Sequence, residues 1–215
     1  MSQLFPSTFG FYVRLALIAV VVIVTAGFLA WRGLTDAPNV LNEPIEQPVP
    51  FSHKHHVGDD GIACRYCHTS VETSKFAGIP PIQTCMTCHS QLYTNQPVLA
   101  PLVASWTSGK PLHWNRVNRV PDFVFFNHSI HIAKGVGCVS CHGRIDKMPL
   151  TRRAAPLSME WCLSCHRNPE KHLRPRAVVF DMQWKAKNQQ ALGKRLVREY
   201  HIDKAKLTEC STCHR

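Results

Sequence analysis

The cysteines constrain this chain more than any other feature of its sequence. All ten of them fall into five copies of one pattern, in which two cysteines are separated by two residues and a histidine follows directly. The cysteine pairs are Cys64 and Cys67, Cys85 and Cys88, Cys138 and Cys141, Cys162 and Cys165, and Cys210 and Cys213, and the adjoining histidines are His68, His89, His142, His166 and His214. Because no cysteine is left over, the fold must serve five units of the same chemistry.

This C-x-x-C-H pattern is typical of c-type haem attachment. Two thiols add across the vinyl groups of one haem, and the adjacent imidazole becomes the proximal ligand of its iron. A redox dithiol or half of a zinc site also uses two cysteines at this spacing, but neither requires the histidine. Five copies therefore predict five haems c, five proximal histidines and no thiol left for a disulfide.

An apolar stretch near the N-terminus predicts a membrane anchor. The run from residue 15 to residue 31 carries no charge and lies between Arg14 and Arg32. We expect a spanning helix from about Phe11 to Trp31, with aromatic side chains at both interfaces. A cleaved secretory signal is the alternative, but the end of the run makes a poor cleavage site. Haem attachment places the rest of the chain outside the cytoplasm and leaves the short N-terminus inside it.

Composition divides the rest of the chain. We expect an N-terminus and anchor over 1–32, a proline-rich linker over 33–50 that lifts the next domain off the membrane, and a pentahaem domain over 51–215. Within that domain we expect two dihaem modules, at about 51–112 and 113–180, and the fifth haem in 181–215.

The predicted fold class is mostly α and coil. Five macrocycles in 165 residues would form most of the core, so little regular secondary structure and few strands are expected. Short helices should contain or follow the attachment motifs, where three side chains converge on one haem. The segment from Trp184 to Tyr200 lacks proline, is rich in good helix formers and is the best candidate for a helix in this domain.

An internal repeat predicts four distal ligands. Phe51 to His56 and Phe126 to His131 both read F-x-H-x-x-H, and each precedes two attachment motifs. Two histidines three residues apart lie on one side of a helical turn, so one segment can ligate two haems. The pattern resembles the class III multihaem cytochromes, in which such pairs serve different haems. The predicted distal ligands are His53, His56, His128 and His131.

The fifth distal ligand is left open by the residues alone. The candidates are Met148, Met159, His172 and His201. A methionine ligand would raise the potential of its haem, whereas the ordinary role of a methionine is to fill gaps in packing.

Net charge adds little about partners. The chain carries a formal charge of +11, but a ferric haem with two ionised propionates contributes about −1, so five haems would leave about +6. Many arginines and lysines are therefore expected beside propionates. Nothing in the sequence points to nucleic-acid recognition.

Several stretches resemble one family closely, namely the pentahaem ActA subunit of alternative complex III. They are residues 114–117, 120–128, 135–138, 141–144 and 161–170, and the likeness extends to the N-terminal anchor, all five motifs and the closing residues 210–215.

This resemblance implies a relay in a bacterial inner membrane, with the haem domain on the periplasmic side. It implies electron transfer between an iron–sulfur subunit and a monohaem cytochrome, within a complex that oxidises quinol and reduces a periplasmic carrier or a terminal oxidase. The subunit would have no catalytic residues of its own. The family has mostly bis-histidine haems and one His/Met haem, which makes Met148 the favoured fifth ligand.

Three other functions compete with the relay. A membrane-anchored tetrahaem quinol dehydrogenase also has one N-terminal helix, but it has four haems. A multihaem reductase needs an iron with an open position, often marked by an altered attachment motif. A soluble periplasmic shuttle would have no anchor.

The haem count gives the first testable prediction. We expect mass spectrometry of the denatured, fully matured chain to show five covalent haem adducts, because every cysteine belongs to an attachment motif. Four or fewer adducts would contradict the assignment of the motifs.

Overall fold

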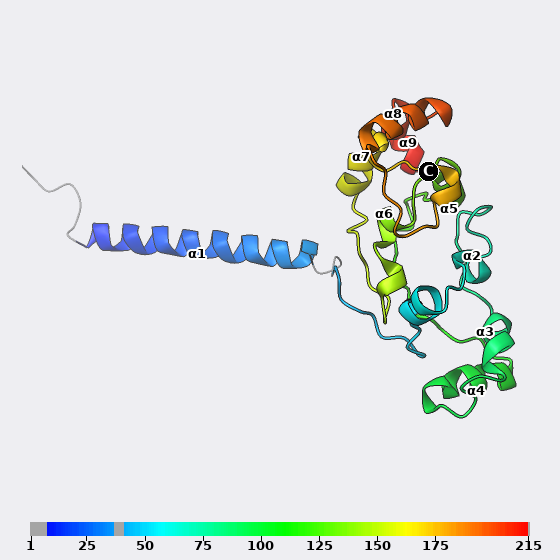
Figure 1. The fold of residues 1–215 in the computed structure, drawn as a ribbon. Helices are drawn as coiled ribbons and strands as arrows, with labels where there is room; N and C mark the ends of the chain where they lie inside the picture. The colour runs from blue at the N-terminus through cyan, green and yellow to red at the C-terminus, as the bar shows by residue number, and fades with distance from the viewer. Residues whose placement is uncertain (1–7, 37–40, 215) are drawn as a thin grey trace, which may run out of the picture. The chain divides into compact units, whose positions relative to one another are not determined.

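The computed structural model describes residues 8–36 and 41–214 and divides into two units between Val40 and Leu41. Figure 1 shows the first unit as one long helix and the second as a cluster of short helices and loops. Predictions that concern residues 1–7, part of the linker at 37–40 and the last residue, 215, lie outside the described residues.

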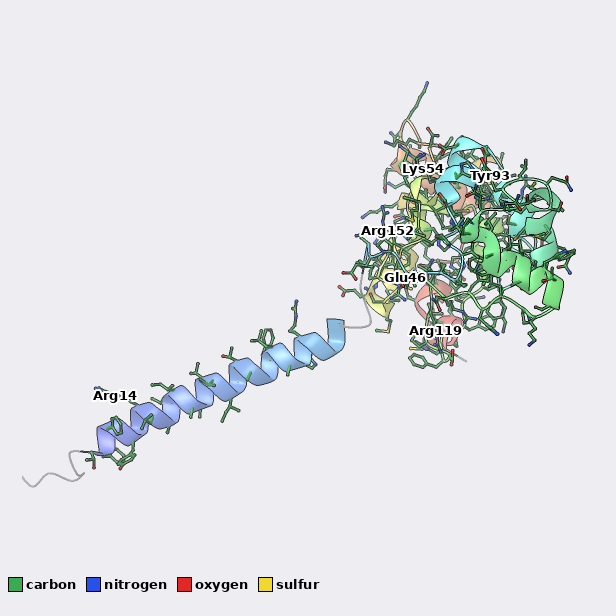
Figure 2. All side chains as sticks on the ribbon, turned by 90° about the horizontal axis from the view of Figure 1, so that it is seen from below. Arg14, Glu46, Lys54, Tyr93, Arg119 and Arg152 are labelled. Carbon is green, nitrogen blue, oxygen red and sulfur yellow. The ribbon has the colours of Figure 1, made fainter. Side chains whose placement is uncertain are left out.

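The first unit is α1 (Phe9–Asp36). Within Phe9–Gly33, the most apolar window of 18 residues has a mean hydropathy of 2.5, and none of its residues is buried. Its 28 residues extend about 42 Å at 1.5 Å per residue, compared with about 30 Å for the hydrocarbon core of a bilayer. Side chains project all around it, with Arg14 near its N-terminal end (Figure 2). The predicted apolar helix is therefore present and long enough to cross a membrane.

The second unit is built from short helices, as predicted. Those that carry attachment motifs are α2 (Cys64–Cys67), α3 (Ile82–His89), α6 (Val139–His142), α7 (Met159–Arg167) and α9 (Cys210–Cys213). The other helices are the π-helix η2 (Lys54–Asp59), α4 (Ala100–Ser108), α5 (His128–Ala133) and α8 (Gln189–Glu199). The 3₁₀ turns are η3 (Pro97–Leu99), η4 (Ile145–Lys147), η5 (Pro169–Lys171), η6 (Arg176–Val178) and η7 (Lys206–Thr208). Within the described residues, extended pairing is limited to three isolated bridges, Pro44 with Arg152, Val124 with His214 and Val136 with Leu173.

The second half of the predicted linker belongs to the second unit. The Asn42 N–H donates to the Arg153 carbonyl at 2.9 Å, and Pro44 forms an isolated bridge with Arg152. Arg152 and Glu46, two residues after Pro44, are labelled in Figure 2. Val49 is buried as well. The compact unit therefore begins ten residues before the predicted boundary at 51, because backbone hydrogen bonds tie this proline-rich segment to the segment 151–153.

A small apolar core packs beside α8. Leu173, Leu196 and Tyr200 are its buried members. A methyl group on Gly193 would meet the Glu170 carbonyl, so a glycine lets α8 approach η5 closely. This core is limited in extent, in line with a domain that does not rely on apolar side chains alone.

The helix predicted over Trp184–Tyr200 begins later than expected. The Asp181 carboxylate accepts hydrogen bonds from the backbone N–H groups of Gln183 and Trp184, which holds a turn there. The Asn188 side chain then accepts from the Ala191 N–H at 3.0 Å and caps α8.

The packing of α8 gives a stability prediction. We expect Leu196→Ala to lower the free energy of unfolding of the holo-protein by about 2–5 kcal/mol, because Leu196 is 2% exposed and its removal leaves a cavity. Denaturant unfolding followed by the haem Soret band would measure it. Lys194→Ala, on the exposed face of the same helix, should change stability by less than about 0.5 kcal/mol. Equal stability of the two variants would contradict a structural role for this core.

Candidate haem sites

The attachment motifs form helical turns that bring their thiols to one side. Residues three apart are neighbours on a helix surface, so a C-x-x-C turn presents both sulfurs to one ligand. None of the ten cysteines is in a disulfide. Burial is the main cause that raises the pKa of Cys141 to about 12 and the pKa values of Cys138 and Cys165 to about 11. Redox-active dithiols have lowered pKa values instead, which disfavours that reading of the motifs.

A structural zinc site requires about four converging ligands. Over residues 8–36 and 41–214, no group of three or more His, Cys, Asp or Glu side chains is placed to hold a metal ion by itself.

Four pairs of imidazole rings face each other across the second unit. In each pair one histidine follows an attachment motif and the other comes from an F-x-H-x-x-H segment. The pairs are His53 with His68, His56 with His89, His128 with His142, and His131 with His166, with ring centroids 6.4, 6.1, 6.4 and 6.2 Å apart. Two metal–nitrogen bonds of about 2 Å, plus the ~1 Å from each nitrogen to its ring centre, require a separation of about 6 Å. The residues present therefore fit an iron between each pair.

The angle between the two imidazole planes distinguishes the pair of His56 and His89 from the other three pairs. The two planes lie within 28° of each other in three pairs, at 11° for His53 and His68, 8° for His128 and His142, and 28° for His131 and His166. The planes of His56 and His89 cross at 65°.

The Nδ1 atoms of these histidines are held by hydrogen bonds. Carbonyl oxygens are the partners for His56 (Ser52), His68 (Gly78), His89 (Leu92), His128 (Lys75), His131 (Asn127), His166 (Leu207) and His214 (Phe123). His53 pairs with the Thr151 hydroxyl, and His142 lies 3.3 Å from the Asn118 side-chain amide. An Nδ1–H that donates to a carbonyl fixes the tautomer and leaves the Nε2 lone pair for a metal.

A phenylalanine orients each distal pair. Phe51 lies 4.9 Å from His53 at an angle of 86°, and 4.5 Å from His56 at 23°. Phe126 repeats this geometry, 4.7 Å from both His128 at 86° and His131 at 31°. The sequence repeat is thus matched by a repeat in ring geometry. The motif included these phenylalanines, but their orienting role was not predicted.

Burial keeps several of these imidazoles neutral. Desolvation, followed by the nearby His68, lowers the pKa of His53 to about 4. Desolvation, followed by His128, lowers the pKa of His142 to about 4. The neutral ring is the form that binds metals.

His214 differs from the other four motif histidines. Its ring stacks on Phe123 with centroids 5.8 Å apart, and the Phe125 N–H donates to the Cys213 carbonyl at 2.6 Å. Among the described residues, no second imidazole stacks opposite it. No sequence pattern pointed to Phe123, because the contact depends on the backbone bridge between Val124 and His214.

Among the described residues, none of the candidates for the fifth distal ligand makes a hydrogen bond or ring contact with His214. Met148 is 2% exposed at the end of η4, and its carbonyl accepts from the Lys54 N–H. η4 packs against η2, whereas α9 packs against η7. Met159 is 69% exposed, His201 is exposed and His172 is partly buried. The assignment of Met148 stays a prediction, and its packing places it among the first-module residues.

Attachment turns backed by opposed imidazoles on a helix-and-coil scaffold define a multihaem cytochrome c, a class that transfers electrons through covalently bound haem. The class III cytochrome c family matches residues 32–102, and the family of cytochrome c7 and related cytochromes c matches residues 124–215. A protein of Nitratidesulfovibrio vulgaris (strain Hildenborough), named as the multihaem cytochrome c subunit of menaquinone reductase, is 36% identical over 157 residues. The alignment covers 63% of this chain and 74% of that protein. The chain belongs to the class III and cytochrome c7-like multihaem cytochromes c.

Ring orientation gives a spectroscopic prediction. Near-parallel imidazole planes split the iron d orbitals strongly, whereas crossed planes leave them nearly degenerate. We expect the ferric protein to show one highly anisotropic low-spin EPR signal beside ordinary rhombic signals, and His56→Ala to abolish it. His131→Ala should remove a rhombic signal instead. A highly anisotropic signal that survives His56→Ala would contradict the pairing of His56 with His89.

Proposed function

We propose that this chain is a relay that carries electrons through five haems c inside a membrane-bound oxidoreductase. The observation that carries the proposal is the set of four opposed imidazole pairs with centroids 6.1–6.4 Å apart. An iron with two imidazole ligands has no open position for a substrate. The chain then performs electron transfer alone, and catalysis on a substrate belongs to its partners.

In this proposal each motif holds one haem through its two thioethers and its own histidine. His53 and His56 serve the haems of Cys64 and Cys85, and His128 and His131 serve those of Cys138 and Cys162. The bound haem supplies the one-electron chemistry. The protein's residues set the orientation of each imidazole, keep it neutral and hold neighbouring sites close.

The wider assembly is proposed to be alternative complex III. The stretches that resemble its pentahaem subunit, the five attachment motifs and the apolar α1 support this. One helix is too little structure to enclose a quinol, so quinol chemistry is assigned to partner subunits. The partners proposed are an iron–sulfur subunit, a monohaem cytochrome and a downstream periplasmic carrier or terminal oxidase.

The name of the N. vulgaris relative favours a second candidate, in which electrons run towards menaquinone instead of away from quinol. The same series of haems serves either direction, because electron transfer through it is reversible. The potentials of the partners on each side decide which way the current flows.

The proposed location is a bacterial inner membrane, with the haem domain on the periplasmic side. We expect protease added to right-side-out spheroplasts to digest the haem domain, because covalent attachment of haem c occurs outside the cytoplasm. A cytoplasmic marker protein should stay intact in the same sample. Digestion only after lysis would reverse the proposed orientation.

The relay itself is tested by purifying the chain alone with its haems. We expect full reduction by dithionite but little quinol oxidation, and recovery of quinol-dependent reduction when the partner subunits are restored. Full quinol oxidation by the isolated chain would contradict the relay and favour a self-sufficient quinol dehydrogenase.

A further inference from the structure

The two attachment helices of the first module are joined directly. Tyr66 and Thr87 lie inside the C-x-x-C turns of α2 and α3, and their hydroxyl oxygens are 2.9 Å apart. On the distal side, the Phe51 ring contacts both His53 and His56. The Cys64 and Cys85 sites are therefore linked on both faces.

The second module continues into the last motif. Phe126 contacts both His128 and His131, the distal histidines of the Cys138 and Cys162 sites. The imidazole of His166 then donates to the Leu207 carbonyl at 2.9 Å in η7. η7 packs against both α7 and α9. The Cys162 site is thus the neighbour of the Cys210 site.

The two modules meet between the Cys64 and Cys138 sites. His128 donates to the carbonyl of Lys75, in the loop that follows α2, at 2.8 Å. The Arg65 guanidinium lies 5.0 Å from the centroid of the Phe180 ring, and the Cys138 N–H donates to the adjacent Val179 carbonyl. These contacts run from α2 to α6 and do not involve α3.

We propose that the five haems form a single file in the order of the Cys85, Cys64, Cys138, Cys162 and Cys210 sites. Figure 1 shows the matching helices α3, α2, α6, α7 and α9 in succession along the second unit, with α3 and α9 towards opposite ends. The order therefore differs from the order of the motifs in the sequence. The first motif lies in the interior of the file, and the second lies at one end.

This inference rests on the proposed relay and assigns it two terminal haems, one for electron entry and one for electron exit. Each step moves one electron from a ferrous iron to its ferric neighbour, with no bond broken and no proton transferred. The step between the Cys64 and Cys138 haems is the crossing between modules. The Cys85 and Cys210 haems exchange electrons with the partners, one at each end.

A pair of ligand variants of the full holo-chain tests the order. A methionine ligand raises the potential of a haem. His53→Met should therefore make the Cys64 haem the first of the four bis-histidine sites to be reduced, and His56→Met the Cys85 haem. A reduced low-spin haem is diamagnetic and no longer speeds the spin relaxation of ferric neighbours. Pulsed EPR on samples poised with that haem reduced measures the spin relaxation of the remaining ferric haems, and relaxation slows only for its neighbours. Each ferric signal is assigned to its haem by its loss in the alanine variant of the distal histidine.

The single file predicts that reducing the Cys64 haem slows relaxation of both the Cys85 and the Cys138 haems. Reducing the Cys85 haem should slow only the Cys64 haem. An order that follows the sequence predicts the reverse pattern and would overturn the proposal. If a variant fails to mature, iron anomalous diffraction from wild-type holo-crystals decides the order, because the Cys85 iron should then have the Cys64 iron as its one close neighbour. Five low-spin haems in a different order would contradict the single file but would remain consistent with the relay.

Discussion

Opposed imidazole pairs are the interaction on which the rest of this structure depends. Each pair brings an attachment turn opposite a segment elsewhere in the chain, with ring centroids 6.1–6.4 Å apart. The small core around Leu173, Leu196 and Tyr200 supports only the end of the unit near α8. An iron between two imidazoles would add strong bonds at these points, and its macrocycle would supply the apolar surface that side chains lack.

The two modules share a plan but differ in one ligand orientation. Phe51 and Phe126 position their histidines almost identically. The proximal histidines differ in what holds them, since His89 donates to Leu92, just past its own helix, whereas His166 donates to Leu207 in the distant η7. This difference in anchoring accompanies the crossed planes of His56 and His89 and the more parallel planes of His131 and His166. Sequence duplication thus preserved the distal side more closely than the proximal side.

The end of the linker and the start of the helix before Tyr200 differ from the predicted positions, because tertiary contacts shift both. Proline content suggested a free linker up to residue 50, yet Asn42 and Ile45 donate hydrogen bonds to the segment 151–153. Helix propensity favoured a start at Trp184, yet the Asp181 carboxylate holds the preceding residues in a turn. The assignment of Met148 as a distal ligand stays a prediction, and packing buries this side chain beside η2.

Sequence patterns alone predict the apolar N-terminal helix, the helix-and-coil class, the five C-x-x-C-H turns and the repeated F-x-H-x-x-H segments, because each depends on residue types at short, fixed spacings. Tertiary structure alone decided which histidine faces which, that His56 and His89 cross at 65°, and that His214 meets Phe123. It also placed the first motif beside the third, through contacts such as that of His128 with Lys75, 53 residues away. Local spacing fixes the chemistry of each site, whereas the order of the sites depends on long-range packing that no short pattern records.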